Sequence, residues 1–166
     1  MAGVVIAGTG GRNLHSADPD LRDLVADQIG TYIYDSKPEM VMSGMAEGFD
    51  ELLAAVAIEM SIPLWCAIPT KSYGAYYWSD HSLSGDDRQE DFDWYLHQAE
   101  RVTYVMEDVK RSSGLYWKGR HANFVRNDYM VETADCFVVY NPTTPGTKQC
   151  YGSIVAAKKP YTIVGP

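Results

Sequence analysis

The chain has 166 residues, 46% of them hydrophobic, which is enough apolar material for one packed domain and excludes a disordered chain. Its formal net charge of −8 argues against a general binder of the nucleic-acid backbone, because such proteins need a basic surface. A small phosphorylated ligand remains compatible with this charge, since a few local donors outweigh an unfavourable total.

Short apolar runs and helical stripes alternate along the chain. The first run, 4–7, is β-branched and precedes a helical stripe at 21–33 that has cap residues ahead of it. A second run at 40–43 precedes the clearest helical stripe, 49–60. The later predicted elements are strands at 63–68, 101–106, 136–140 and 161–164, helices at 91–99, 127–134 and 147–158, and a loop over 70–90.

This alternation predicts an α/β fold: a Rossmann-like, mostly parallel sheet with helices on both faces, formed by residues 1–166 as a single domain. Ligands of such sheets bind at the carboxyl ends of the strands. The loops after the first, second and fifth strands are therefore the places where a binding site is expected.

The loop after the first strand, "AGTGGR", is rich in glycine. Glycines let backbone N–H groups approach an anion, and an arginine adds charged donors. The spacing departs from the dinucleotide fingerprint, and a tight turn that needs glycine is the structural alternative. The candidate phosphate-binding residues here are Gly8, Thr9, Gly10, Gly11 and Arg12.

The loop after the second strand, "SGMAEGFDE", combines small and acidic residues. Ser43 and Gly44 let the backbone come close to a ligand. Asp50 is interpreted mainly as a partner of the helix dipole. Glu47 lies earlier in the loop, where a carboxylate can bind ribose hydroxyls or act as a general acid or base.

Two further segments complete the candidate site. Arg126 and Asn127 open a predicted amphipathic helix, for which an ordinary surface arginine is the favoured interpretation. The stretch "NPTTPGT" then leaves the fifth strand through a stiff bend. Pro145, Gly146 and Thr147 place a helix N-terminus there, which favours a bound phosphate.

Other kinds of site are not supported. The four histidines lack metal-ligand spacing, so neither a metal nor a cofactor is expected. Trp78 and the nearby tyrosines form either an aromatic wall for a base or a lid packed on the protein itself. The odd number of cysteines and the absence of a basic leader or a ~20-residue apolar run indicate a cytoplasmic protein without a membrane span.

The four segments together resemble the SLOG superfamily, in particular its YpsA-like branch. The similarity runs over nearly the whole chain and includes "AGTGGR", "SGMAEGFDELLAAVAIEMSIPLWCAIP", "RNDYMVETADCFVVY" and the Gly-Thr helix opening. The resemblance implies a Rossmann-like domain that binds nucleotides, with phosphate near the glycine turn, Arg126 and Gly146-Thr147. Relatives include phosphoribohydrolases of the LOG type, sensors of cyclic ADP-ribose-like signals and the DNA-processing protein DprA.

One departure from the family pattern bears on catalysis. LOG-type enzymes carry a glutamate shortly after the Gly-Thr, whereas here Lys148 to Tyr151 supply no carboxylate. We therefore expect a binder of a nucleotide or a cyclic, ADP-ribose-like ligand, acting as a sensor or sequestering protein. The alternative is a nucleoside-monophosphate N-glycosidase, with Glu47 as the catalytic carboxylate. A homodimer is expected, with the apolar stripe 49–60 serving both core and partner.

Overall fold

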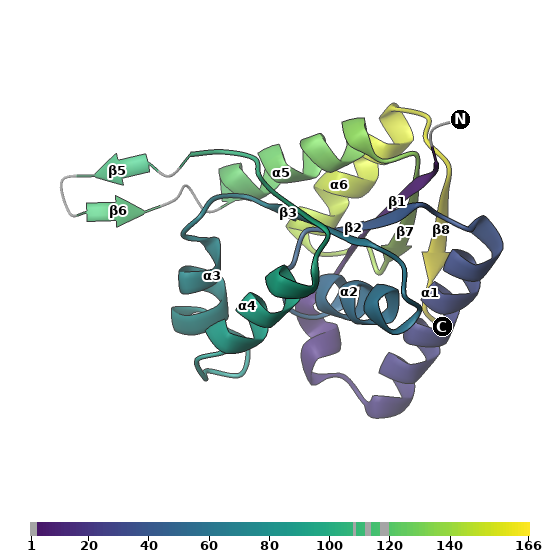
Figure 1. The fold of residues 1–166 in the computed structure, drawn as a ribbon, viewed down its shortest axis with the longest axis horizontal. Coiled ribbons are helices and arrows are strands. Elements are labelled where there is room, and N and C mark those ends of the chain that lie inside the picture. Colours follow the sequence, from purple (N-terminus) through teal and green to yellow (C-terminus); the bar gives the residue numbers. More distant parts are fainter. Residues whose placement is uncertain (1–2, 108, 112–113, 117–119) are drawn as a thin grey trace.

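A six-stranded parallel sheet forms the centre of the protein (Figure 1). The computed structural model describes residues 3–107, 109–111, 114–116 and 120–166. The strand order is β4-β3-β2-β1-β7-β8, and a separate antiparallel hairpin, β5-β6, extends away from the sheet. The strands are β1 Val5–Gly10, β2 Met40–Ser43, β3 Leu64–Ile68, β4 Arg101–Tyr104, β5 Val109–Arg111, β6 Gly114–Tyr116, β7 Cys136–Tyr140 and β8 Tyr161–Val164.

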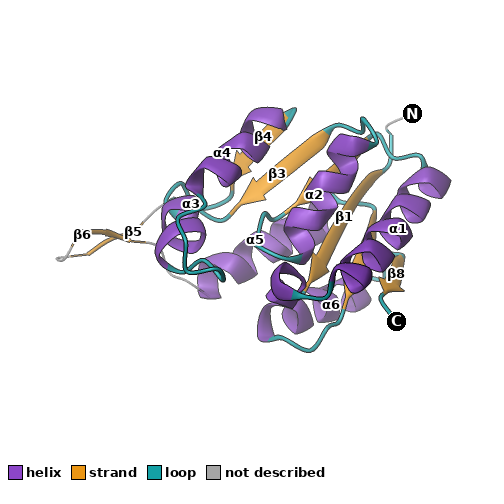
Figure 2. Cartoon of the chain, turned by 90° about the horizontal axis from the view of Figure 1, so that it is seen from below, coloured by secondary structure: helices purple, strands orange, loops and turns teal. Residues whose placement is uncertain are grey.

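Helices cover both faces of this sheet (Figure 2). Three of them, α1 Pro19–Ser36, α2 Phe49–Glu59 and α4 Gln89–Gln98, lie on one face, while α5 Arg120–Thr133 and α6 Pro145–Ala156 lie on the other. This arrangement confirms the predicted α/β, Rossmann-like fold. The remaining short elements are η1 Arg12–Ser16, α3 Tyr73–Ala75 and η2 Tyr76–Asp80.

Successive residues of each strand point to opposite faces of the sheet and pack into different parts of the core, as expected for strands buried on both faces. In β1, Ile6 packs with α1 and α2, whereas Ala7 packs with α5 and α6. The apolar stripe of α2 is largely buried in this way, with Phe49, Leu53 and Val56 all in the core beneath α1. A homodimer would therefore need another surface than this stripe.

The first strand is longer than predicted, because the glycines expected in a loop belong to β1. Helix α2 presses directly on this end of the strand. A Cβ atom on Gly8 would lie 2.8 Å from Leu53 Cδ2, and one on Gly10 would lie 2.6 Å from Phe49 Cβ. Gly8 and Gly10 are thus required by helix–strand packing, which the sequence interpretation did not consider.

The prediction of a loop over 70–90 was wrong for residues 73–80 and 89–90, which are helical, and is confirmed for 81–88. The chain there forms α3 and the single π-helical turn η2, which pack on β3 and α4. Trp78 in η2 is fully buried, and its Nε1 donates a hydrogen bond of 2.9 Å to the carbonyl of Met45. Tyr73 is also buried, so these two aromatic residues belong to the core.

Two of the three free thiols are deeply buried. Burial raises the pKa of Cys66 and of Cys150 to about 12, and it also raises the pKa of the half-buried Cys136. Among the helices of the described ranges, none combines the length and the apolar character that a bilayer crossing requires.

The order of the strands defines one crevice in the sheet. From β1 the chain moves outward through β2 and β3 to β4, and it then returns to the opposite side of β1 with β7 and β8. The direction of winding therefore changes between β1 and β7, which end level with each other because Gly10 pairs with Tyr140. Sheets of this class bind ligands at that switch point.

Candidate functional site

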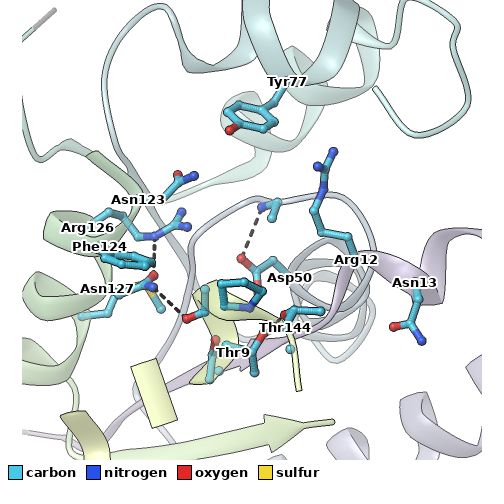
Figure 3. A pocket seen from close by; sticks show the side chains of 17 residues that line it. Thr9, Arg12, Asn13, Asp50, Tyr77, Asn123, Phe124, Arg126, Asn127 and Thr144 are labelled. Carbon is cyan, nitrogen blue, oxygen red and sulfur yellow. Dashed lines mark hydrogen bonds between the residues drawn. The ribbon is translucent and has the colours of Figure 1, made fainter. Parts of the chain in front are cut away.

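A pocket of about 400 Å³ opens at the carboxyl ends of β1 and β7, at the switch point (Figure 3). It is walled by the end of β1 and the turn after it, the β2–α2 loop, one side of α5, the first turn of α6, and η2. The lining residues are Gly8, Thr9, Gly10, Arg12, Asn13, Ala46, Asp50, Tyr77, Asn123, Phe124, Arg126, Asn127, Met130, Thr144, Pro145, Gly146 and Thr147.

The first turn of α6 lines this pocket. Pro145 occupies the first turn, no side chain caps it, and no acidic residue lies in it. The nearby Thr144 hydroxyl donates to the Thr147 hydroxyl at 3.0 Å. A Cβ atom on Gly146 would meet nothing within 4 Å. The positive end of the helix dipole therefore faces open space.

Helix α5 contributes a buried arginine. Arg126 is 6% exposed, and it lies within the helix, not at its start as predicted. Its Nε donates to Asn127 Oδ1 at 2.9 Å, and its Nη1 donates to the carbonyl of Gly44. Its Nη2 makes no hydrogen bond to any residue of the described ranges, so one edge of the guanidinium is left for a ligand.

Asn127 links this arginine to the start of α6. Its Nδ2 donates to the carbonyl of Gly146 at 3.3 Å and to Gln149 Oε1 at 3.0 Å. The amide oxygen of Asn127 is thereby directed at Arg126. The pair fixes the arginine relative to the helix N-terminus, so both positive features of the pocket form one rigid unit.

Asp50, at the start of α2, supplies the carboxylate of the pocket. Its Oδ2 accepts from the backbone N–H of Ala46 at 3.2 Å, and within the described chain its other oxygen accepts no hydrogen bond. Burial raises the pKa of Asp50 to about 6, although Arg126, the Ala46 N–H and Arg12 act in the opposite direction.

Ser43 and Gly44 hold this carboxylate and the arginine in place without lining the pocket themselves. The Ser43 hydroxyl donates to the carbonyl of Asp50 at 2.8 Å and accepts from the N–H of Met45 at 3.2 Å. A Cβ atom on Gly44 would lie 2.7 Å from Arg126 Cζ and 3.0 Å from Asp50 Oδ2. Only glycine leaves room for both charged groups.

Glu47 has a different environment from the one predicted. Its side chain is fully buried and does not line the pocket. It accepts from the N–H of Leu83 at 2.8 Å and from Arg88 Nη1 at 2.8 Å, and it lies 3.4 Å from Arg12. No local signal separates Glu47 from Asp50 in the sequence, because the partners of Glu47 are 36 and 41 residues away.

The opposite wall of the pocket is aromatic and amide-bearing. Tyr77 lies across the cavity from Thr9 and Thr144, with Asn123 beside it on α5 (Figure 3). The guanidinium of Arg12 lies 5.3 Å from the centre of the Tyr77 ring, and its Nη2 donates to the carbonyl of His81 at 3.3 Å. Of the aromatic residues considered for a base, Tyr77 is thus the one at the pocket.

The structure brings most of the predicted site residues together. Both glycine-bearing segments, at the end of β1 and after β7, lie at one rim of the sheet. The predicted residues that line the pocket are Gly8, Thr9, Gly10, Arg12, Arg126, Asn127, Pro145, Gly146 and Thr147. Gly11, Ser43, Gly44 and Glu47 lie outside the lining. The binding role of each residue stays a prediction.

Comparison with known proteins supports the fold. No protein-family model and no curated protein sequence matches the chain. Among solved structures, DNA processing protein A from Helicobacter pylori, described with a single-stranded DNA binding mode, superposes on 96% of the chain with a TM-score of 0.65 and 14% identity. The same protein from Streptococcus pneumoniae also covers 96%, with a TM-score of 0.61 and 12% identity.

The molybdenum cofactor carrier protein from Chlamydomonas reinhardtii shares the fold as well, with a TM-score of 0.56 and 12% identity over 96% of the chain. The present chain spans 75% of that protein, but only 64% and 50% of the two DNA processing proteins. These neighbours have a Rossmann-like fold in common with this chain, and at such low identity they establish the fold alone.

Proposed function

We propose that the protein binds a nucleotide or nucleotide-derived molecule in the pocket between β1 and β7, as a sensor or sequestering protein of the YpsA-like branch of the SLOG superfamily. The observation that carries this proposal is the uncapped N-terminus of α6 in the same pocket as the buried Arg126. Both are suited to an anion. A volume of about 400 Å³ matches the size of small-molecule sites.

The remaining walls suit the rest of a nucleotide. Tyr77 offers an aromatic face to a base, and the segment from Gly8 to Gly10 lines the pocket beside the start of α6. Asp50 supplies an acceptor between these regions. A cyclic, ADP-ribose-like signal would use the same set of groups, because it contains the same phosphate, sugar and base.

The descriptions of the structural neighbours suggest two other kinds of ligand for the same pocket. One neighbour is described as a binder of single-stranded DNA and another as a carrier of the molybdenum cofactor. The net charge of −8 disfavours a long nucleic acid, whose binding depends on many phosphate contacts. A small anionic molecule needs only the groups of the pocket, so we favour it.

The test places a charge at the helix N-terminus without changing the packing. Gly146→Asp adds a carboxylate where a side chain meets no atom within 4 Å, and an acidic residue in the first turn does not destabilise a helix. We expect wild-type protein to gain melting temperature with a member of a panel of nucleoside monophosphates, ADP-ribose, cyclic ADP-ribose and a short single-stranded oligonucleotide.

Gly146→Asp should lose this gain, and Gly146→Asn, which has the same shape without the charge, should keep most of it. Gly152→Asp is the matched control, because this glycine of α6 is exposed, meets nothing within 4 Å and does not line the pocket. Equal ligand-induced shifts in Gly146→Asp and wild type would contradict an anion site at α6. A response to the oligonucleotide alone would favour single-stranded DNA.

A second function is favoured by one observation, the buried carboxylate of Asp50 in the pocket. In a nucleoside-monophosphate N-glycosidase this group, in place of Glu47, would lie at the sugar while water adds to its anomeric carbon and the base departs with a proton. Chromatography of AMP, GMP, CMP and UMP after incubation separates the two functions. Free base that forms with wild type and not with Asp50→Asn would establish the enzyme.

A further inference from the structure

We infer that Asp50 binds the ribose hydroxyls of the ligand, so that the pocket selects ribonucleotides over deoxyribonucleotides. This inference rests on the proposed function and names the class of nucleotide that the pocket accepts. It starts from two buried groups of opposite charge, Asp50 and Arg126, which are 7% and 6% exposed.

Each of these groups has hydrogen-bonding capacity that the protein leaves unused. One oxygen of Asp50 and Nη2 of Arg126 make no hydrogen bond with the described part of the chain, although both residues line the pocket. Neither atom is sealed from solvent, because among the described residues Asn123 Oδ1 is the one fully buried side-chain nitrogen or oxygen without a partner, so both atoms are open to the pocket. A ligand with a hydrogen-bond donor for the Asp50 carboxylate and an acceptor for the Arg126 guanidinium would use both of these atoms.

The carboxylate restricts which part of a nucleotide can lie beside it. An ionised carboxylate only accepts hydrogen bonds and repels phosphate, so the phosphate belongs at the helix N-terminus and at Arg126. The donors of a nucleotide are its sugar hydroxyls and the amino groups of its base. A carboxylate with one open side suits sugar hydroxyls, as acidic side chains do in other nucleotide sites.

The order of the groups along the pocket favours the sugar over the base. Thr144 and the start of α6 lie on one side, Tyr77 lies on the opposite side, and Asp50 lies between them (Figure 3). In a nucleotide the ribose joins the phosphate to the base. With phosphate at α6 and the base against Tyr77, the ribose is the part that reaches Asp50.

Neighbouring groups are arranged to keep Asp50 in this position. Its Oδ2 is held by the N–H of Ala46, and its backbone carbonyl is held by the Ser43 hydroxyl. The carboxylate therefore cannot turn away without breaking a hydrogen bond. Such a fixed acceptor discriminates strongly against an analogue that lacks the matching hydroxyl, because the carboxylate would then stay unsatisfied.

The experiment measures the affinity of AMP, GMP, CMP and UMP together with their 2′-deoxy and 3′-deoxy counterparts by isothermal titration calorimetry. It is done at about pH 8, above the pKa of about 6 of Asp50, so that the carboxylate is ionised. For the nucleotides that bind wild type, we expect removal of a ribose hydroxyl to weaken binding by about tenfold or more.

Asp50→Asn should weaken the ribonucleotide and reduce the preference over its deoxy counterpart to less than about threefold. Asp23→Asn, at an exposed position of α1, is the matched control and should retain the wild-type preference. Equal affinities of ribo- and deoxyribonucleotides for wild type would overturn this inference and leave the proposed function standing. A wild-type preference among the nucleotides that depends only on whether the base carries an amino group would also overturn this inference. If none of these monophosphates binds wild type, this inference fails; the proposed function fails as well only if ADP-ribose and cyclic ADP-ribose do not raise the melting temperature either.

Discussion

Asp50 is the residue in which the requirements of folding and of the pocket conflict most directly. Its carboxyl group is buried, and it is satisfied on one side only, by the N–H of Ala46. Burial raises its pKa from 3.8 to about 6 even though Arg126 lies near. The ionised carboxylate therefore destabilises the folded protein at neutral pH, which is common for groups kept for binding or catalysis.

The free energy of unfolding should show this conflict as a function of pH. Between about pH 4 and pH 6 the folded state binds more protons at Asp50 than the unfolded state, so the contribution of Asp50 to stability falls as pH rises. Asp50→Asn removes this contribution. Across that interval the free energy of unfolding of the variant should rise by about 3 kcal/mol relative to that of wild type.

Chemical denaturation of both proteins from about pH 4 to pH 8 checks this prediction. The difference between variant and wild type is the quantity to follow, because every other carboxylate titrates equally in both. Asp23→Asn, at an exposed position of α1, serves as the control for the substitution itself. A constant difference for Asp50→Asn would show that its carboxyl group has an ordinary pKa.

Among the elements, those predicted correctly are the ones whose pattern is local. The strands at 40–43, 136–140 and 161–164 have the predicted bounds, because short apolar runs between turn residues leave little choice. The loop predicted over 70–90 failed for residues 73–80 because the burial of Trp78 depends on Met45 and Phe92, which are distant in sequence.

The same distinction applies to the candidate site. Glycine and Gly-Thr segments could be predicted because their local chemistry is distinctive, and the parallel sheet brought their ends to one rim. The identity of the pocket carboxylate could not be predicted, because Glu47 and Asp50 occupy similar positions before and within the first turn of α2. Their roles separate through Leu83 and Arg88, which bind Glu47 from the segment before α4.

The η2 turn should be important for the stability of the pocket wall. Trp78→Phe removes the hydrogen bond to the carbonyl of Met45, which adjoins the pocket residue Ala46, and it leaves a cavity in a fully buried site. We expect a loss of about 2 kcal/mol in the free energy of unfolding. Trp94→Phe, at a position that is 50% exposed, should change it by less than about 0.5 kcal/mol.

Denaturant unfolding of both tryptophan variants distinguishes these cases. Similar losses in the two variants would mean that Trp78 is not specifically anchored to the β2–α2 loop. Tryptophan fluorescence gives an independent readout, since the buried indole of Trp78 is replaced in one variant and retained in the other.

Across the whole molecule, an ionic cluster joins the start of α2 to the segment that carries η2 and α4. Arg88 Nη1 lies 2.8 Å from Glu47 Oε2, and Arg88 Nη2 lies 2.6 Å from Glu51 Oε2. The Arg88 guanidinium also lies 4.8 Å from the centre of the Trp78 ring. Because Arg12 at the pocket contacts the same Glu47, the cluster connects the core to the wall of the pocket.

Glu47→Gln should therefore weaken the fold more than it weakens the site. Glutamine keeps one acceptor for Leu83 or Arg88 but loses the charge that the buried ion pair needs, so we expect a loss of about 2–3 kcal/mol in the free energy of unfolding. Glu90→Gln, at an exposed position of α4, should be nearly neutral. Below the melting temperature, Glu47→Gln should still bind nucleotide.

Thermal unfolding and calorimetric titration of both glutamine variants check this expectation. Nucleotide binding that disappears in folded Glu47→Gln while its stability is unchanged would assign Glu47 to the ligand. The opposite result, a destabilised protein that still binds, would distinguish its role from that of Asp50.

The raised pKa values of the three thiols have a practical consequence. With pKa values near 12 for Cys66 and Cys150, and a raised pKa for Cys136, almost no thiolate is present at neutral pH, so maleimides should scarcely react with the native protein. A cysteine introduced at the exposed Thr143, beside the start of α6, would then be the sole site for a fluorophore. Such a single-label protein would report the arrival of a ligand directly, without any change to its own thiols.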